Sequence, residues 1–349
     1  MATRPLTALL IADGKPGHYH QAEGVIAAVA RVRPVESQRL EVRRRFVIPT
    51  RTLLQMVNWG AAPALVLRLG YGLQARSLPA ADLVVSAGGE TLAANAAIAK
   101  ALGVPNVFCG RLRRLQPRHV SLVIVSLMRF AELPNHLVTL PPSPIDAAPR
   151  AINGEDAARY GRTSPPPRVG VLIGGDSGTF RYTSQDWLQL THFLGEAHRL
   201  RGIRWLIATS RRSGPDISDV IAAMTSKAEC GIDTLVDFRT AGPGTLPSIF
   251  AAADAILCTD DSTTMISEAV AACLPVVSVA PAACTLEERE AEYREMLAGK
   301  GWYRSLPLAR LTPETFLAAL EEIAPRTSSQ VDELADAMSR RLPELFARA

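Results

Sequence analysis

Short apolar runs alternate with segments of helical spacing along the first half of the chain. An apolar run of a few residues bounded by glycine, proline or polar residues is typical of a parallel strand covered on both faces. The segments 21–32 and 91–103 instead carry alanines and apolar residues at helical spacing, and the second ends in a glycine. The strands expected in this half are 7–12, 40–48, 83–89, 104–110, 120–126 and 136–142.

The same alternation restarts after 141–168, a segment rich in proline, alanine and polar residues that we interpret as a linker. Repeated strand–helix units joined by short loops predict a parallel sheet with helices on both faces. The strands expected here are 168–175, 204–210, 233–238, 255–260 and 274–281, and the helices are 184–200, 217–228, 246–254 and 264–273.

Two such halves predict an α/β protein of two doubly wound, Rossmann-like domains facing a central cleft. We place the first domain at 1–160 and the second at 161–325, and we expect a C-terminal helix at 326–349 to pack back on the first domain. Ligands of such sheets bind outside the carboxyl ends of the strands, so the loops after the strands are where function is expected.

The composition is that of an ordinary soluble protein. The chain has 349 residues, 48% hydrophobic and 21% charged, which suits about two domains. No apolar run reaches the ~20 residues of a membrane helix, and the first run leads straight into DGKPGH without a signal-peptide cleavage site. Five cysteines without a C-x-x-C pair argue against a disulfide framework or a zinc site. We expect a cytoplasmic protein with no bound metal.

The net charge of +4 hides an asymmetry. Residues 1–150 carry 18 basic against 8 acidic side chains, a balance of +10, and the remainder has a balance of −6. Within the stretch 40–78, basic residues flank an apolar segment. It either lies on an anionic membrane face or forms a core helix whose arginines reach solvent. Its arginines are Arg43, Arg44, Arg45, Arg51, Arg68 and Arg76. We expect no nucleic-acid partner, because aromatics are only 5% and no binding motif occurs.

The stretch 255–279 is the strongest candidate for a binding site. Its strand ends at Asp260 and Asp261, and hydroxyls follow where a helix would begin, at Ser262, Thr263 and Thr264. Free N–H groups and the positive helix dipole favour an anion such as a diphosphate there. Glu268, one turn later, could accept hydrogen bonds from ribose hydroxyls. Alternatively, Ser262 only caps the helix and Glu268 faces solvent.

Two further loops of the second half carry donors for phosphate or sugar oxygens. In LIGGDSGTFRYT, Gly174 and Gly175 would let the backbone approach a ligand, although an ordinary tight turn explains the same pattern. Of the adjacent arginines in SRRS, only one can point inward, and we favour Arg211 over Arg212 for a phosphate contact. The remaining hydrogen-bonding candidates are Ser177, Thr179, Arg181 and Ser210.

Two loops of the first half also attract attention. DGKPGHYHQ, residues 13–21, follows the first strand with two glycines, a lysine and two histidines, but it is neither a Walker loop nor a G-x-G-x-x-G turn. SAGGET, residues 86–91, opens a helix, and Glu90 would serve as a base or as a favourable charge at the helix start.

The motifs DGKPGHYHQ, VGVLIGGDSGTFRYT, LIATSRRS and CTDDSTTMISEA occur in an order that resembles the mitochondrial fission ELM-type family, which is expected to have a GT-B-like fold. The last motif is also similar to the donor-binding end of the transferase that forms lipid II and of the non-hydrolysing UDP-N-acetylglucosamine 2-epimerases. In the ELM-type pattern the strand VVSAG is followed by a basic pair, whereas Gly89 and Glu90 stand here. This departure leaves the acceptor open.

The resemblance implies a role for each motif. Ser262, Thr263 and Thr264 would hold a diphosphate, with Asp261 beside them, and Glu268 would hold ribose. The first loop resembles the glycine-rich loop of the lipid II-forming enzyme, so Gly14, Lys15 and Gly17 would meet the donor. His18 would be the base, with His20 in reserve, and Asp13 and Glu90 complete the expected catalytic set.

We therefore expect a metal-independent glycosyltransferase of the inverting type. It would use a nucleotide-diphosphate sugar as substrate, need no cofactor and act on a cell-envelope or lipid-linked acceptor, peripherally on the inner face of the membrane. Two alternatives remain: a nucleotide-sugar 2-epimerase-like isomerase, and an inactive protein that binds nucleotide sugars.

Overall fold

The computed structural model describes residues 4–46, 48–146, 167–227, 230–242 and 244–347. The chain divides into two compact units. The first comprises residues 1–146 and 330–349, and the second comprises residues 147–329. The sequence suggested domain boundaries at 160 and 325 instead. Most of the expected linker, 147–166, lies outside the described residues. Within the described residues, each unit holds one parallel sheet of six strands.

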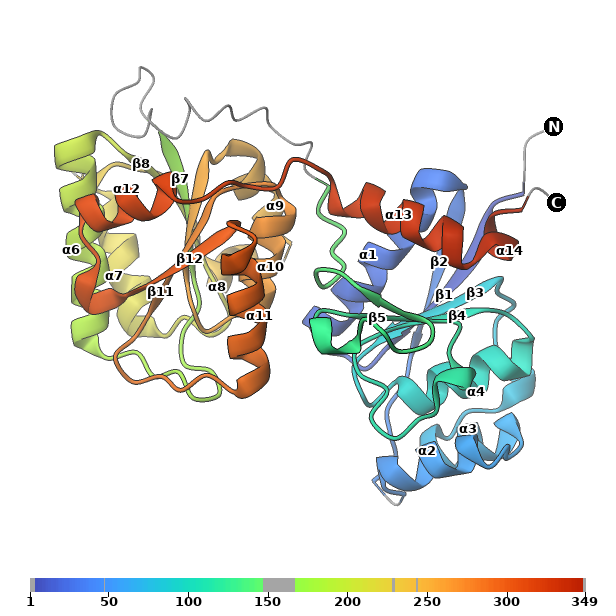
Figure 1. The fold of residues 1–349 in the computed structure, drawn as a ribbon. Coiled ribbons are helices and arrows are strands. Elements are labelled where there is room, and N and C mark those ends of the chain that lie inside the picture. Colours follow the sequence, from blue (N-terminus) through green and yellow to red (C-terminus); the bar gives the residue numbers. More distant parts are fainter. Residues whose placement is uncertain (1–3, 47, 147–166, 228–229, 243, 348–349) are drawn as a thin grey trace. The chain divides into compact units, whose positions relative to one another are not determined.

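The sheet of the first unit has the strand order β2-β1-β3-β4-β5-β6 (Figure 1). Its strands are β1 (Leu6–Ala12), β2 (Val35–Glu41), β3 (Leu83–Ala87), β4 (Asn106–Cys109), β5 (Leu122–Val125) and β6 (His136–Val138). Its helices are α1 (Pro16–Val32), α2 (Thr50–Asn58), α3 (Pro63–Tyr71), α4 (Leu92–Leu102), α13 (Gln330–Arg341) and α14 (Pro343–Phe346).

Alternate residues of β1 belong to two separate hydrophobic cores. Leu9 and Ile11 pack with α2, α3 and α4, whereas Leu10 and Ala12 pack with α1 and α13. The two sets of helices cover opposite faces of the sheet (Figure 1). A strand that is apolar on both faces needs helices on both, as the continuous apolar runs predicted. The side-chain amide of Gln330 donates to the carbonyl of Leu140 at 2.9 Å, which fixes the start of α13 in this unit.

The second strand lies earlier than the sequence suggested. β2 pairs with the whole of β1, from Leu6 opposite Val35 to Ala12 opposite Glu41, so it ends before the arginines of the expected strand 40–48. The strand is mostly exposed and polar at the sheet edge. It therefore lacks the apolar run that indicates a buried strand.

The sheet of the second unit has the order β12-β11-β10-β7-β8-β9. Its strands are β7 (Arg168–Ile173), β8 (Arg204–Thr209), β9 (Ile232–Val236), β10 (Ala255–Thr259), β11 (Val276–Ala280) and β12 (Tyr303–Pro307). Its helices are α6 (Ser184–Arg201), α7 (Pro215–Thr225), α8 (Phe238–Ala241), α9 (Leu246–Ala252), α10 (Thr263–Ala271), α11 (Glu288–Gly299) and α12 (Pro313–Glu321).

The helices of this unit start and end where the sequence provides caps. Thr183 and Asp186 form a reciprocal capping box at the start of α6, and Gly202 ends the helix in the left-handed conformation. The strand order reverses direction at β7 and β10, which are neighbours in the sheet. In parallel sheets this reversal point opens the crevice where ligands bind, so a ligand site is expected at the loops after β7 and β10.

Candidate functional site

The loop that follows β1 places a carboxylate in contact with an imidazole. Asp13 Oδ2 lies 2.8 Å from His18 Nδ1, and the side chains are 2% and 32% exposed respectively. Asp13 Oδ1 also accepts the backbone N–H of Lys15 at 3.2 Å, which closes the turn. Because a carboxylate only accepts hydrogen bonds, Nδ1 carries a proton in this contact, and in the neutral imidazole the lone pair is then on Nε2.

The local sequence explains how this contact forms. Gly14 adopts φ +78°, which turns the chain out of the strand, and Pro16 occupies the first turn of α1, where its missing N–H costs nothing. The helix thus begins five residues earlier than expected, so Gly17 and His18 lie in its first turn rather than in a loop. Gly17 thus belongs to the helix, and its contact with the donor stays a prediction. His20 lies two residues after His18, on another side of the helix.

The ring of His18 packs against the turn that follows β3. Gly88 there adopts φ +85°, and a Cβ on it would overlap the His18 ring. Both the backbone angle and the space therefore require glycine. The hydroxyl of Thr91 lies 2.9 Å from the carbonyl oxygens of Ala87 and Gly88 and holds the turn in place.

Arg113 is a residue of this region that sequence reasoning missed. Its guanidinium occupies the space where a Cβ of Gly89 would lie, and its φ of 54° is unusual for a residue other than glycine. Such angles gather at functional sites. Nothing in the basic stretch RLRRLQPR distinguishes Arg113, so only the tertiary structure reveals it. No side-chain hydrogen bond caps the start of α4, and the catalytic role of Glu90 stays a prediction.

The three motifs expected at the donor site follow β10, β7 and β8, which are neighbours in the sheet, and hydroxyl groups tie them together. The N–H of Gly174 donates to Thr259 Oγ1 at 2.7 Å, and Ser213 Oγ donates to the carbonyl of Gly174 at 2.8 Å. Ser210 Oγ accepts the N–H of Arg212 at 3.1 Å. The structure therefore brings the motifs of the second unit into one site.

An ion pair lies at the centre of this site. Arg212 Nη2 and Nε lie 2.6 Å and 3.0 Å from Asp261 Oδ2, and the side chains are 32% and 0% exposed. Arg211 is exposed, so our choice of Arg211 as the inward arginine is wrong. Tyr182 reaches Asp261 Oδ1 at 3.4 Å. Burial, and then the charges of Asp261 and Asp260, raise the pKa of Tyr182, so its hydroxyl remains a donor.

The glycine pair after β7 has a different role from the one expected. A Cβ on Gly174 would overlap the carboxylate of Asp261, and one on Gly175 would overlap the carbonyl of Arg212. The groups that approach these glycines closely therefore belong to the protein. The pair lets three loops pack, which in turn fixes the Arg212–Asp261 contact.

The next residues form a tight turn that is also tied to the loop after β11. The backbones of Ser177 and Phe180 exchange hydrogen bonds, and Thr179 Oγ1 donates to the carbonyl of Thr285. Arg181 Nη1 donates to the carbonyl of Phe180 at 2.7 Å. The tight-turn interpretation thus describes the local structure. Donor contacts by Ser177 and Thr179 stay predictions.

The start of α10 shows both a cap and buried polar groups. Ser262 Oγ accepts the N–H of Met265 at 3.4 Å, so Ser262 is the cap of the helix. Thr263 Oγ1 is buried and has no hydrogen-bond partner among the described residues, whereas Thr264 is exposed. Glu268 is only 7% exposed, so the alternative that it faces solvent is wrong.

Asp260 belongs to a separate, closed network. Its Oδ1 accepts from Arg294 Nε at 2.9 Å, from the Tyr303 hydroxyl at 2.9 Å and from Ser278 Oγ at 3.0 Å. Arg294 and Asp260 side chains are 6% and 3% exposed. Asp260 therefore joins β10 to β11, β12 and α11. Its neighbour Asp261 faces the loops of the site.

Among the described residues, no group of three His, Cys, Asp or Glu side chains could hold a metal ion. No helix in that part of the chain is long and apolar enough to cross a membrane.

Comparison with known proteins places the chain in a family. Residues 16–342 match the family described as Mitochondrial fission ELM1. The chain belongs to this family. The match spans both units, three of the four motifs in full and the first motif from Pro16 onward, so the family expected from the sequence is confirmed. Comparison with curated proteins gave no match to this sequence.

Solved structures share the fold at low sequence identity. The UDP-GlcNAc 2-epimerase of Methanocaldococcus jannaschii is 12% identical, with a TM-score of 0.54 over 98% of this chain and 100% of that one. MnaA of S. aureus, solved with UDP, is 11% identical, with a TM-score of 0.51 over 99% and 98%. MurG of Acinetobacter baumannii is 15% identical, with a TM-score of 0.49 over 96% and 100%. The first two of these likenesses show the fold alone, and the GT-B-like α/β architecture is confirmed.

Proposed function

We propose that the protein is a glycosyltransferase that moves a sugar from a nucleotide-diphosphate sugar to a hydroxyl of a cell-envelope or lipid-linked acceptor. The observation that carries this proposal is the contact between His18 and buried Asp13 at the carboxyl end of β1. Asp13 holds the tautomer in which Nε2 is a base. An imidazole in that state takes a proton from a hydroxyl near neutral pH.

The second unit would bind the donor. Asp261 engages Nε and Nη2 of Arg212, which leaves the N–H groups of Nη1 for phosphate oxygens. The start of α10 adds backbone N–H groups and the unpartnered hydroxyl of Thr263. Buried Glu268 would accept the ribose hydroxyls. Since MnaA was solved with UDP, UDP is the first nucleotide to test.

The reaction is a single displacement. Nε2 of His18 removes the acceptor's hydroxyl proton while the oxygen forms a bond to the anomeric carbon of the sugar. The bond from that carbon to the phosphate oxygen breaks, and the electron pair leaves with the nucleoside diphosphate. Arg212 and the start of α10 offset the new negative charge, so no metal or cofactor is needed. A single displacement inverts the configuration at the anomeric carbon.

The acceptor is proposed to carry a phosphate. The guanidinium of Arg113 lies against Gly89, next to Gly88 on which His18 packs. A cation beside the base suits an acceptor whose reacting hydroxyl lies near an anionic group, as in a lipid-linked sugar phosphate. Such an acceptor places the protein peripherally at an anionic membrane face.

Thermal unfolding with nucleotides tests the donor site. A ligand that binds only the folded state at a hundred times its Kd stabilises the protein by about 2.7 kcal/mol, which raises the midpoint by several degrees. We expect this shift with UDP or another nucleoside diphosphate. If no nucleoside diphosphate or nucleotide sugar in a broad panel shifts the midpoint, the donor site is wrong.

Chromatography of a bound nucleotide sugar then separates the possible activities. Release of nucleoside diphosphate together with a glycosylated acceptor supports the transferase. Conversion to a second nucleotide sugar of equal mass would contradict the transferase proposal and support an epimerase instead. Binding without any conversion across lipid-linked and envelope acceptors would leave a nucleotide-sugar-binding protein.

A further inference from the structure

Two stretches of the first unit contain no acidic residue. Residues 42–81 have six arginines without any aspartate or glutamate, and residues 91–131 have five arginines and one lysine, again without a carboxylate. An ordinary solvated surface mixes both signs of charge. These stretches therefore supply most of the positive charge of the first half.

The fold joins the two stretches at the end of α2. Asn58 Nδ2 donates to the carbonyl of Arg114 at 2.8 Å, and the N–H of Gln116 donates to Asn58 Oδ1 at 2.9 Å. Arg118 Nη2 donates to the carbonyl of Asn58 at 2.9 Å. Trp59, the next residue, thus lies beside the second acid-free stretch.

Large apolar side chains are exposed along the same helix pair. The buried faces of α2 and α3 pack towards α4 and the sheet, so these helices form the outer layer of this side of the unit (Figure 1). On α3, Leu65, Arg68 and Leu69 have the spacing of one exposed helix face. The exposed fractions are 90% for Phe46, 80% for Trp59, 38% for Leu65 and 36% for Leu69.

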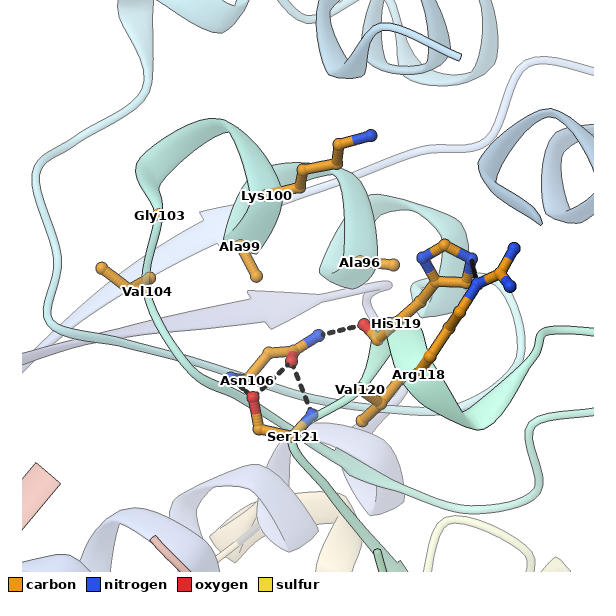
Figure 2. Close-up of a pocket in the computed structure, with 10 residues that line it drawn as sticks. All are labelled: Ala96, Ala99, Lys100, Gly103, Val104, Asn106, Arg118, His119, Val120 and Ser121. Carbon is orange, nitrogen blue, oxygen red and sulfur yellow. Dashed lines mark hydrogen bonds between the residues drawn. The ribbon is translucent and has the colours of Figure 1, made fainter. Parts of the chain in front are cut away.

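A basic pocket lies next to this helix pair. Lys100, Arg118 and His119 line a cavity of about 400 Å³ whose lining includes no carboxylate. Figure 2 shows these side chains among the residues that line it. Arg118 Nε lies 3.4 Å from His119 Nε2. Burial, and then the charges of Arg118 and Lys100, lower the pKa of His119 below its ordinary value, so both cations lie close enough to act on the imidazole.

We propose that this side of the first unit docks on an anionic phospholipid bilayer, with Trp59 at the interface and the pocket of Lys100, Arg118 and His119 receiving a headgroup phosphate. Phe46, Leu65 and Leu69 enter the interface, while Arg51 and Arg68 contact neighbouring headgroups. Indole rings prefer the headgroup level of a bilayer, and arginines bind phosphate there. This inference rests on the proposed function, because it assigns the peripheral membrane association of that function to one surface of the first unit.

The charge pattern favours a bilayer over a second copy of the chain. In a symmetric dimer the same patch would meet itself, and each acid-free surface would face like charges without a carboxylate to pair. A bilayer containing anionic lipid supplies negative charge and apolar depth together.

Co-sedimentation of the full chain with vesicles tests the proposal. We expect the chain to pellet with phosphatidylcholine vesicles that contain phosphatidylglycerol and to stay in solution with phosphatidylcholine alone. Near 1 M salt, where the Debye length is about 3 Å, the pelleted fraction should fall. Equal recovery on neutral and anionic vesicles would overturn the proposal.

Matched variants locate the surface. Arg68→Glu and Lys100→Glu should each lower partitioning by about fivefold or more, because each basic residue near the membrane contributes roughly that factor. Arg310→Glu and Lys227→Glu reverse exposed charges of the second unit and should have little effect. Trp59→Ser should weaken binding to vesicles more than Leu188→Ser, which changes an exposed apolar residue of the second unit.

Two controls keep the outcomes distinct. The unfolding midpoint of each variant, and its shift with UDP, should match the parent, so a failure of the donor site cannot be mistaken for loss of membrane binding. Analytical ultracentrifugation reports the oligomeric state. A dimer that Trp59→Ser or Arg68→Glu converts to a monomer would overturn the proposal and assign the surface to self-association.

Discussion

Each unit pairs a buried carboxylate with a partly exposed basic side chain, but the two basic groups differ in their chemistry. In the first, a carboxylate that is 2% exposed holds an imidazole that is 32% exposed; in the second, a carboxylate that is 0% exposed holds a guanidinium that is 32% exposed. A glycine packs against each pair, Gly88 on His18 and Gly174 on Asp261. Each buried acid thus orients a half-exposed base or cation.

The difference between the pairs lies in what the basic group can do. Histidine exchanges a proton near neutral pH, whereas arginine keeps its charge. Asp13–His18 therefore suits proton transfer, and Asp261–Arg212 suits a fixed positive charge for a phosphate. If the comparison is right, substitutions in the first pair change turnover and those in the second change nucleotide affinity.

The largest expected effect comes from His18→Ala. Loss of a general base lowers turnover by about 10²–10⁴-fold, while the affinity for UDP stays unchanged. Transfer rates and calorimetry of UDP binding measure the two quantities. His20→Ala, on the same helix, is the control and should retain the parent rate. Equal losses in both variants would remove His18 from its assigned role.

Arg212→Ala should have the next largest effect, on nucleotide affinity. Hydrogen bonds to charged groups contribute about 1.5–3 kcal/mol, so UDP binding should weaken by roughly tenfold to a hundredfold. Arg211→Ala removes an exposed arginine beside it and should change affinity little. Thermal unfolding without ligand checks that Asp261, left without its partner, has not destabilised the fold. Equal affinities for both variants would contradict the assignment.

Gly88→Ala tests the support of the imidazole. Its left-handed backbone costs roughly 1–2 kcal/mol with a Cβ, and that Cβ also displaces the His18 ring. Gly103→Ala has a similar φ of +70° but open space around its Cβ, so it carries the backbone cost alone. Denaturant unfolding should show a loss of stability in both variants. Only Gly88→Ala should also lower the turnover rate. Full activity in Gly88→Ala would mean that the ring position is not critical.

The smallest expected effects compare Asp13→Asn with Asp261→Asn. Asparagine keeps the shape and removes the charge, which costs about 1 kcal/mol of hydrogen bonding, or about fivefold in a rate or binding constant. Asp13→Asn should lower turnover and spare UDP affinity, and Asp261→Asn should do the reverse. Kinetics and calorimetry on the same preparations decide it. The same pattern in both variants would show that the pairs do not divide the work as proposed.

Periodicity predicted most elements because buried strands and helices each need a continuous apolar face. It misplaced two elements. The edge strand β2 was placed too late, because its polar residues carry no apolar run and pairing with β1 alone fixes its register. The start of α1 was placed too late, because two glycines and a proline suggested a loop although Pro16 begins the helix.

Of the candidate site, the sequence by itself determined which loops matter. Each motif follows a strand, and parallel strands bring their carboxyl ends to one edge of a sheet. It could not determine which side chain of a motif turns inward, because that depends on contacts between loops far apart in the chain. Only the tertiary structure turned Arg212 rather than Arg211 onto Asp261 and set Arg113 against Gly89. It also gave the adjacent Asp260 and Asp261 different partners, because consecutive residues after a strand face different neighbours.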